Sequence, residues 1–284
     1  MINFHIIFGK EIYMKKDNSI LFSYNKIVGK RKFTDTHIHD TNELYYLIDG
    51  QTKYFIGDEI ISVEKNDFVF IPAGMFHKTD SEKCLNNERI VLHFNDDILG
   101  EEAKKLLGKL SKQKVFTVKE NKLHLLTELL SQIEKETDKN DDYSDIIKKS
   151  DTLNLLAFIL RFKKETSPKE LTNTDLTINK ITKYISANFS DDITLSTLSQ
   201  TFNISESHLS RKFKEISGIG ISEYITYVRI TYAQKLLKEK KLPMTQIALK
   251  CGFNDSNYFS TVFKRIKGIT PLKYAKTENT KNDI

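Results

Sequence analysis

Residues 194–218 read Thr-Leu-Ser-Thr-Leu-Ser-Gln-Thr-Phe-Asn-Ile-Ser-Glu-Ser-His-Leu-Ser-Arg-Lys-Phe-Lys-Glu-Ile-Ser-Gly. Residues 243–268 read Pro-Met-Thr-Gln-Ile-Ala-Leu-Lys-Cys-Gly-Phe-Asn-Asp-Ser-Asn-Tyr-Phe-Ser-Thr-Val-Phe-Lys-Arg-Ile-Lys-Gly. A shift of fifty positions places Phe213 on Phe263 and Ile216 on Ile266. A shared period of this kind indicates one supersecondary unit that is used twice.

Each copy has the pattern of a helix-turn-helix. Asn203 and Gly252 stand in the expected tight turns, and both are residue types that tolerate a left-handed backbone. Ser205 in the first copy, and Asn254 or Asp255 in the second, are good N-caps for the helix that follows. In that second helix of each copy, apolar residues recur at helical spacing.

The opposite face of each second helix is short, polar and basic. It carries Ser207, Ser210, Arg211 and Lys214 in the first copy, and Ser256, Asn257, Ser260 and Lys264 in the second. Small hydroxyls and amides beside an arginine approach base edges in a major groove without bulk. The pattern indicates DNA binding, and an unrelated helical domain with a solvated basic face is the alternative.

A longer series of motifs covers residues 194–274. The motifs are Ser205-x-x-x-Leu-Ser-Arg-x-Phe-Lys214, Arg229-x-x-x-Ala-x-x-Leu-Leu237, Ile247-Ala-x-x-x-Gly-Phe253, Ser256-Asn-Tyr-Phe-Ser-x-x-Phe-Lys264 and Gly268-x-Thr-Pro-x-x-Tyr274. This series resembles the DNA-binding domain of the AraC/XylS family of bacterial transcription regulators. The resemblance implies a sequence-specific regulator, and we expect an activator.

The resemblance also implies which side chains read bases. They are Ser207, Ser210 and Arg211 in the first unit, and Ser256, Asn257, Ser260 and Thr261 in the second. Thr261 departs from the family pattern, since many members have arginine there, and threonine lacks the bidentate grip of arginine on guanine. We therefore predict that the first unit discriminates more between sequences. The side chains expected at phosphates are Lys214, Lys264, Arg265 and Lys267, each with an ordinary solvated charge as the alternative.

Charge is divided unevenly along the 284 residues. Residues 177–284 hold 17 Lys and Arg against 9 Asp and Glu, a net +8, whereas the remaining residues hold 27 against 29, a net −2. The positive excess lies where phosphates have to be neutralised. Cys84 and Cys251 are far apart and indicate no disulfide framework. Without a signal peptide or a membrane-spanning stretch, the protein is expected to be cytoplasmic and to have no membrane partner.

Residues 1–120 contain short apolar or alternating runs that predict β-strands. The runs cover residues 3–8, 44–48, 53–56, 59–63, 68–71 and 89–94. Turn signals such as Asp49-Gly50 and Gly57-Asp58 separate them. Many short strands at near-regular spacing predict a sandwich or a barrel.

Two groups of residues in this region resemble the sequence motifs of the cupin barrel. One group is His37-Ile-His39, Glu43 and Gly50, and the other is Asn66, Pro72-Ala-Gly74 and His77. Asn66 and Arg31 replace the usual leading glycines of the two motifs. In metal-containing cupins the positions of His37, His39, Glu43 and His77 bind the ion. On a strand, His37 and His39 point to one face, and imidazoles with a carboxylate suit transition metals.

Three roles stay open for these side chains: a metal site, an organic-effector site that includes Tyr45, or a purely structural network. A catalytic metal would need an open coordination position and a substrate, and the sequence shows neither. We therefore assign no cofactor and no enzyme activity. Tyr45, Tyr54, Phe70 and His93 alternate along predicted strands, and either line the interior of the barrel or pack in its core.

Residues 121–165 carry leucine and isoleucine at helical spacing, which predicts two amphipathic helices. The family resemblance implies a dimerisation segment, and the alternative is a stripe that packs only within its own subunit. Residues 166–176 have the composition of a linker. Residues 222–238 predict one long helix, capped by Ser222, between the two helix-turn-helix units, and residues 277–284 a disordered tail.

The predicted fold class is therefore α+β. A cupin-like sensor domain (1–120) and a helical dimerisation segment (121–165) precede a linker (166–176), an all-α DNA-binding domain (177–276) and a tail (277–284). The expected partners are double-stranded DNA, RNA polymerase, a small-molecule effector and a second copy of the chain. The alternative function is a metal-dependent cupin enzyme, or a metal sensor, fused to a DNA-binding domain.

Overall fold

The computed structural model describes residues 20–28, 36–80, 86–139, 141–164, 170–239 and 241–280. These residues belong to two compact units, one that ends at Thr172 and one that begins at Asn173. The predicted strand at residues 3–8, Arg31 and Cys84 lie outside the described residues.

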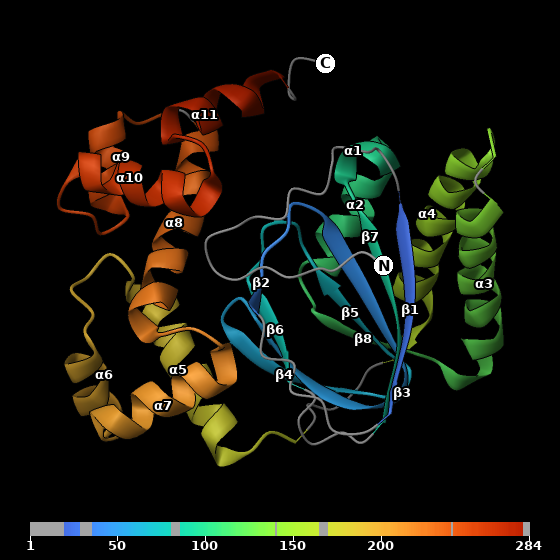
Figure 1. Cartoon of the computed structure of the whole chain (residues 1–284), viewed down its shortest axis with the longest axis horizontal. Helices are drawn as coiled ribbons and strands as arrows, with labels where there is room; N and C mark the ends of the chain where they lie inside the picture. The colour runs from blue at the N-terminus through green and yellow to red at the C-terminus, as the bar shows by residue number, and fades with distance from the viewer. Residues whose placement is uncertain are drawn as a thin grey trace. The chain divides into compact units, whose positions relative to one another are not determined.

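Antiparallel strands build the sheet of the N-terminal unit (Figure 1). They are β1 (Leu21–Val28), β2 (Thr36–His37), β3 (Asn42–Ile56), β4 (Glu59–Glu64), β5 (Asp67–Ile71), β6 (His77–Asp80), β7 (Asn86–Phe94), β8 (Val115–Val118) and β9 (Lys163–Lys164). One layer has the order β1-β7-β3-β5-β8-β9, and the second half of β3 pairs with β4 and β6 in the other layer. This arrangement confirms the predicted cupin-like β domain.

The turn predicted at Asp49-Gly50 is wrong. Strand β3 continues through it, and its register with β7 shifts between Leu47 and Asp49. Gly50 has a φ of +105°, a conformation that glycine adopts at little cost. The Asp-Gly pair therefore marks an irregularity of the β-bulge type in a strand shared by two layers, instead of a hairpin turn.

The two faces of β3 contribute to two apolar cores. Leu44 and Tyr46 point to the side that the helices cover, whereas Tyr45 and Leu47 belong to a second core whose buried members all lie on strands. The alternation of side chains along a strand produces this division. Of the two roles left open for Phe70, the structure shows packing, because Phe70 lies in the helix-covered core.

The helices of the N-terminal unit follow β7. They are α1 (Asp96–Leu99), α2 (Glu101–Leu110), α3 (Leu123–Lys139) and α4 (Ser144–Phe162), with the short 3₁₀ helix η1 (Glu120–Lys122) before α3. Helices α3 and α4 lie side by side (Figure 1). Leu126 and Leu130 of α3 and Leu156 of α4 are buried in one core with the sheet. The predicted apolar stripe thus packs within its own chain, as in the alternative to a dimerisation stripe.

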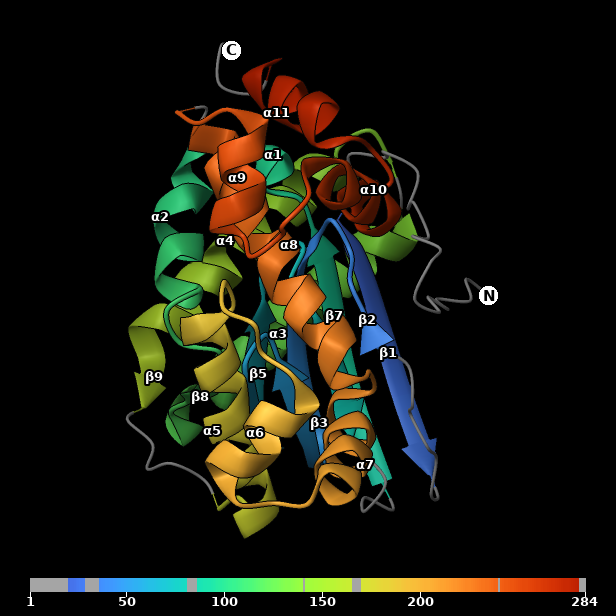
Figure 2. The ribbon, with the colours of Figure 1, turned by 90° about the vertical axis from the view of Figure 1, so that its left-hand side faces the viewer.

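The C-terminal unit consists of helices. They are α5 (Asn173–Asn188), α6 (Leu195–Phe202), α7 (Glu206–Ser217), α8 (Ile221–Glu239), α9 (Met244–Lys250), α10 (Ser256–Lys267) and α11 (Pro271–Thr280). Helix α8 runs between the α6–α7 pair and the α9–α10 pair (Figures 1 and 2). Ile230 and Leu237 of α8 share a core with Phe259 and Phe263 of α10. These elements confirm the predicted pair of helix-turn-helix units joined by a long helix.

The turns of both units have the predicted backbone. Asn203 and Gly252 have φ angles of +52° and +77°, which is the left-handed conformation expected of these residue types. The side chain of Asp255 caps α10 by accepting a hydrogen bond from the backbone N–H of Tyr258. Ser205 stands at the N-cap of α7, but its hydroxyl makes no capping hydrogen bond.

Three predicted boundaries need correction. Helix α5 begins at Asn173, inside the predicted linker, where Asp175 places an acidic side chain in the first turn and so favours a helix start. Helix α8 begins at Ile221, so Ser222 lies within the helix and is not its cap. Helix α11 continues to Thr280, into the predicted tail, because Ala275, Lys276 and Glu278 are good helix formers. Within the described ranges, no helix combines the length and the apolar character needed to cross a membrane.

Candidate DNA interface and ligand site

The second helices of the two helix-turn-helix units, α7 and α10, expose the side chains expected to contact DNA. Leu209 and Phe213 of α7, and Phe259 and Phe263 of α10, are buried. The expected contacts are exposed or half-buried, and they are Ser207, Ser210, Arg211, Lys214, Ser256, Asn257, Ser260, Thr261, Lys264 and Arg265. Burial of the apolar face thus orients the polar face toward solvent on both helices.

Several basic side chains on these helices have no protein partner among the described residues. Arg211, Lys214, Lys264 and Arg265 form no ion pair there. Lys212, by contrast, lies 2.9 Å from the carboxylate of Glu215. An arginine or lysine without a protein partner can bind a phosphate or a base edge without first breaking an ion pair.

Two hydroxyls of α10 are already hydrogen-bonded to their own helix. Ser260 Oγ donates to the carbonyl oxygen of Ser256 at 2.9 Å, and Thr261 Oγ1 donates to that of Asn257 at 3.0 Å. Their lone pairs and the Thr261 methyl group are what these side chains can offer to a base. Asn257 is exposed and offers both a donor and an acceptor.

Arg229 of α8 connects the two helix-turn-helix units. Its Nε and Nη2 atoms donate to the carbonyl oxygens of Phe189 and Asp191, at 2.7 and 2.8 Å. Those carbonyls lie in the segment that leads into the first unit. On the other side, Arg229 borders the turn of the second unit, since its guanidinium carbon lies 5.8 Å from the ring centre of Phe253.

A cluster of three histidines surrounds Glu43 in the N-terminal unit. Glu43 lies on β3, paired with His93 of β7. His77 is the first residue of β6, and His39 lies in the loop between β2 and β3. The Nε2 atoms of His39, His77 and His93 lie 3.1, 3.5 and 4.0 Å from Glu43 Oε2. We refer to these four residues as the histidine cluster.

Backbone contacts hold the loop that carries His39. The carbonyl oxygen of His39 accepts a 2.8 Å hydrogen bond from the N–H of Gly74. The side chain of Asn42 accepts a 3.1 Å hydrogen bond from the N–H of Ala73. The Pro72-Ala-Gly74 turn, which belongs to the second cupin-like motif, therefore fixes the position of the first motif.

The side chains of the histidine cluster differ in their exposure to solvent. Those of His39 and His93 are 16% and 15% exposed, whereas those of Glu43 and His77 are 9% and 3% exposed. His39 and His93 are therefore the members that a ligand reaches most easily from solvent.

Contacts within the cluster lower the pKa of Glu43 and raise the pKa of His39. Burial alone would raise the pKa of Glu43, but hydrogen bonds from His39 and His77 and the charge of nearby imidazoles hold this pKa well below its usual range. Burial likewise opposes protonation of His39, yet the hydrogen bond to Glu43 and its charge raise the pKa of His39. Both ring nitrogens of His39 face acceptors, since Nδ1 lies 2.7 Å from the carbonyl oxygen of Thr41.

The structure brings together three of the predicted site residues, His39, Glu43 and His77. The side chain of His37 lies outside what the structure describes, although its backbone pairs with that of His77. Strand β2 ends at His37, so the period-two argument does not place His39. Tyr45 is 1% exposed and packs edge-on against Tyr54 at 5.2 Å, away from the solvent side of the cluster.

His93 is the cluster residue that the cupin-like motifs do not include. It follows Val91 on the same face of β7, while Leu92 and Phe94 point to the helix-covered core. Strand alternation was the sequence signal for His93, and it favoured core packing over interior lining. Only the pairing of β7 with β3 places this imidazole beside Glu43.

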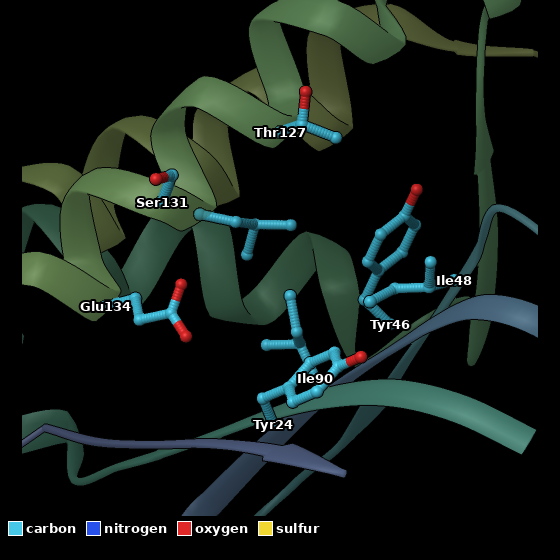
Figure 3. A pocket seen from close by; sticks show the side chains of 8 residues that line it. Tyr24, Tyr46, Ile48, Ile90, Thr127, Ser131 and Glu134 are labelled. Atoms are coloured by element: carbon cyan, nitrogen blue, oxygen red, sulfur yellow. The ribbon is translucent and has the colours of Figure 1, made fainter. Parts of the chain in front are cut away.

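A separate groove of about 350 Å³ opens between α3 and the helix-facing side of the sheet (Figure 3). Its lining residues are Tyr24, Tyr46, Ile48, Ile90, Thr127, Leu130, Ser131 and Glu134. The Tyr24 hydroxyl already donates to Glu88 at 2.7 Å, and that of Tyr46 to Asn66 at 3.0 Å. With these hydroxyls committed, the groove is the less well equipped of the two sites for a polar ligand.

Comparison with known proteins agrees with this two-part architecture. Residues 29–156 match the family model of the AraC-like ligand binding domain, and residues 198–277 match that of a helix-turn-helix domain. The chain belongs to the AraC family of transcription regulators. It is a transcription regulator with an N-terminal ligand-binding domain and a C-terminal DNA-binding domain.

Two similar regulators of this family are curated proteins named HTH-type transcriptional activator RhaR. The one from Mannheimia succiniciproducens is 27% identical, over 84% of this chain and 86% of its own length. The one from Cronobacter sakazakii is 29% identical, over 83% and 84%. Among solved structures, the C-terminal domain of AraT from Geobacillus stearothermophilus is 33% identical over 37% of this AraC-family chain and 88% of that chain, with a TM-score of 0.36.

Proposed function

We propose that this AraC-family regulator is a transcription activator that reads DNA with the exposed faces of α7 and α10. The observation that supports the proposal is the set of exposed side chains on these helices, among which Arg211, Lys214, Lys264 and Arg265 have no ion pair among the described residues. Ser207, Ser210 and Arg211 of α7, with Ser256, Asn257, Ser260 and Thr261 of α10, contact base edges. Lys214, Lys264, Arg265 and Lys267 contact phosphates. The names of the RhaR relatives support activation.

The histidine cluster is the effector site of this proposal. It combines a buried carboxylate with three imidazoles and has access to solvent at His39 and His93. Convergent polar groups within an apolar wall are typical of small-molecule sites. His37 and Tyr45, which are close in sequence to His39 and Glu43, are the other two residues of the proposed effector site. An effector changes transcription only if it binds the two states of the regulator with different affinity.

Footprinting and titration on promoter DNA test the DNA-binding part of the proposal. Protection of two successive major-groove segments is expected, together with weaker binding of the Arg211→Ala variant. In vitro transcription with RNA polymerase tests activation. A regulator that protects its site but lowers transcript yield contradicts activation while leaving the DNA contacts in place.

A melting screen of the full chain tests the effector site. A sugar or small carboxylic acid that binds the cluster raises the melting temperature of the N-terminal unit by mass action, and Glu43→Gln removes that shift. His124→Gln, which changes an exposed histidine of α3, is the matched control. A ligand whose shift survives Glu43→Gln binds elsewhere, for example in the groove of Figure 3.

Self-association is the remaining part of the proposal. Because the leucine stripe of α3 and α4 is buried in its own chain, a homodimer would use other surfaces of residues 121–165. Tyr143 and Ile146 are 69% and 68% exposed at the start of α4. Sedimentation of the wild type against Ile146→Ser measures whether this exposed pair contributes to a dimer.

A further inference from the structure

In each imidazole of the histidine cluster, Nδ1 and Nε2 face different neighbours. In His39, Nδ1 lies 2.7 Å from the carbonyl oxygen of Thr41, and in His77, Nδ1 lies 3.0 Å from that of Met75. In His93, Nδ1 lies 3.4 Å from the hydroxyl oxygen of Thr41. In each ring it is Nε2 that lies within 4.0 Å of Glu43 Oε2.

Hydrogen bonds of this kind are those that orient a metal-binding histidine. An imidazole that donates its Nδ1 proton to a backbone carbonyl has its Nε2 lone pair available for an ion and its ring orientation fixed. The carbonyls of Thr41 and Met75 can fill this role for two of the rings. The Thr41 hydroxyl can accept from the third.

Distances select three of the four residues as a compact set. One ligand atom each of His39, Glu43 and His93 lies within 4.8 Å of the others. His77 Nε2 also lies 3.5 Å from Glu43 Oε2, but at 3% exposure its side chain is the most buried of the four. Two imidazoles and one carboxylate form a ligand set that suits divalent first-row transition ions.

We infer that the N-terminal unit binds a divalent transition-metal ion through His39 Nε2, His93 Nε2 and the carboxylate of Glu43. His77 acts as a positioning residue that supports Glu43 from the buried side. The inference rests on the proposed function of the histidine cluster as the effector site, and it gives the ligand a chemical class. It differs from the cupin motifs because His93 of β7, which they do not include, is a ligand.

Access to the cluster fits this assignment. The two imidazoles in the set are its more exposed members, at 16% and 15%, so solvent reaches the set at His39 and His93. A small chelating molecule, such as a hydroxy acid, would reach an ion held there from solvent. A metal-bound regulator would then recognise an organic effector through the ion as well as through protein groups.

Titration of the metal-stripped full chain with Co²⁺ tests the inference. Isothermal titration gives stoichiometry and affinity, and the visible absorption of Co²⁺ reports its ligands. One ion per chain is expected for the wild type. His93→Gln is expected to weaken binding at least about 100-fold, because even loss of an outer-shell partner costs 10- to 100-fold. The exposed control His124→Gln is expected to keep wild-type affinity.

A second variant separates ligation from folding. His93→Cys places a thiolate at the same position of β7, and a sulfur-to-cobalt charge-transfer band appears only if side chain 93 is bonded to the ion. The expected result is this band in His93→Cys and its absence in the wild type, with unchanged circular dichroism.

The inference is overturned if His93→Gln binds Co²⁺ with wild-type affinity, which is the result the cupin motifs imply because they do not include His93. It is also overturned if Co²⁺ fails to bind the wild type. In that case a melting shift by a metal-free organic ligand, lost in Glu43→Gln, would leave the proposed effector site standing. If neither Co²⁺ binding nor such a melting shift is observed, the proposed effector site is overturned as well.

Discussion

Arg229 Nε donates a 2.7 Å hydrogen bond to the carbonyl oxygen of Phe189, a residue forty positions earlier in the chain. The same side chain reaches Asp191 through Nη2, and the backbone of Gly252 passes so close that a Cβ there would lie 2.9 Å from Arg229 Nε. One guanidinium therefore connects the entrance of the first helix-turn-helix, the linking helix α8 and the turn of the second helix-turn-helix. Its position couples the geometry of the two DNA-reading units.

Gly252→Ala should destabilise the C-terminal unit by about 1–3 kcal/mol. Gly252 has a φ of +77°, and a Cβ would lie 2.9 Å from both Arg229 Nε and the carbonyl oxygen of Ser190. Gly220→Ala is the matched control, since its Cβ would meet only the end of the Glu223 side chain, at 3.5 Å. Calorimetric melting of the full chain measures both variants. Equal melting temperatures of the two variants would show that the close approach of Gly252 to Arg229 makes no difference to stability.

Arg211→Ala should cost more DNA affinity than Asn257→Ala, and it should relax specificity at one base position. A bidentate arginine contact contributes about 1–3 kcal/mol of discrimination, and Arg211 has no competing ion pair among the described residues. In α10 the hydroxyl proton of Thr261 is hydrogen-bonded within the helix. Titrations of both variants against single-base substitutions of the binding site decide the order. A larger loss for Asn257→Ala would assign the main base reading to the second unit.

Lys214→Gln should weaken binding to all sequences about equally and lower the slope of log affinity against log salt by about one. Lys214 is exposed on α7 without an ion pair among the described residues. Lys212→Gln is the control, because Lys212 is already paired with Glu215 at 2.9 Å. The measurement is binding to a specific and a random duplex at several salt concentrations. A loss confined to the specific duplex would place Lys214 at a base instead of a phosphate.

The Cys251 thiol should be unreactive in the folded protein. Burial raises the pKa of Cys251 to about 12, despite the nearby Arg229 charge that lowers it, and the side chain is 0% exposed. Alkylation follows the thiolate, so labelling of Cys251 at pH 8 should occur only after denaturation. Mass spectrometry of peptides containing Cys251, from native and denatured samples, measures the difference. Rapid native labelling would mean that the turn of the second unit opens.

The sequence predicted the DNA-binding half more completely than the histidine cluster, for a physical reason. The residues expected to read DNA lie on two short helices, and the 3.6-residue period separates the buried Leu209 and Phe213 from the exposed Arg211 and Lys214 within a few positions. The cluster depends on strand pairing between distant segments. His39 and Glu43 are close in sequence, but His93 joins them only through the register of β7 with β3.

The β-bulge-type irregularity near Asp49 and Gly50 in β3 shows the same limitation of prediction from local sequence. An Asp-Gly pair between two apolar runs is a strong hairpin signal, and it predicted a turn at residues 49–50. Whether the chain reverses or continues depends on partners outside the local sequence, here β7 on one side and β4 beyond the bulge. Likewise, the apolar stripe of α3 and α4 is buried because the sheet packs against it, and the local sequence does not contain that information.

Glu43 and His39 should show strong energetic coupling in a double-mutant cycle made of Glu43→Gln, His39→Asn and the combined variant. Their 3.1 Å contact joins a carboxylate and an imidazole that are both largely buried, and contacting residues in one network typically couple by about 0.5–3 kcal/mol. Each single change leaves the partner without its counterpart, whereas the double change removes both charges. Melting in the presence of a chelator keeps metal binding out of the comparison. Additive effects of the two substitutions would mean that His77 and His93 compensate for the loss of His39, and that the carboxylate is held by the whole cluster instead of by one ion pair.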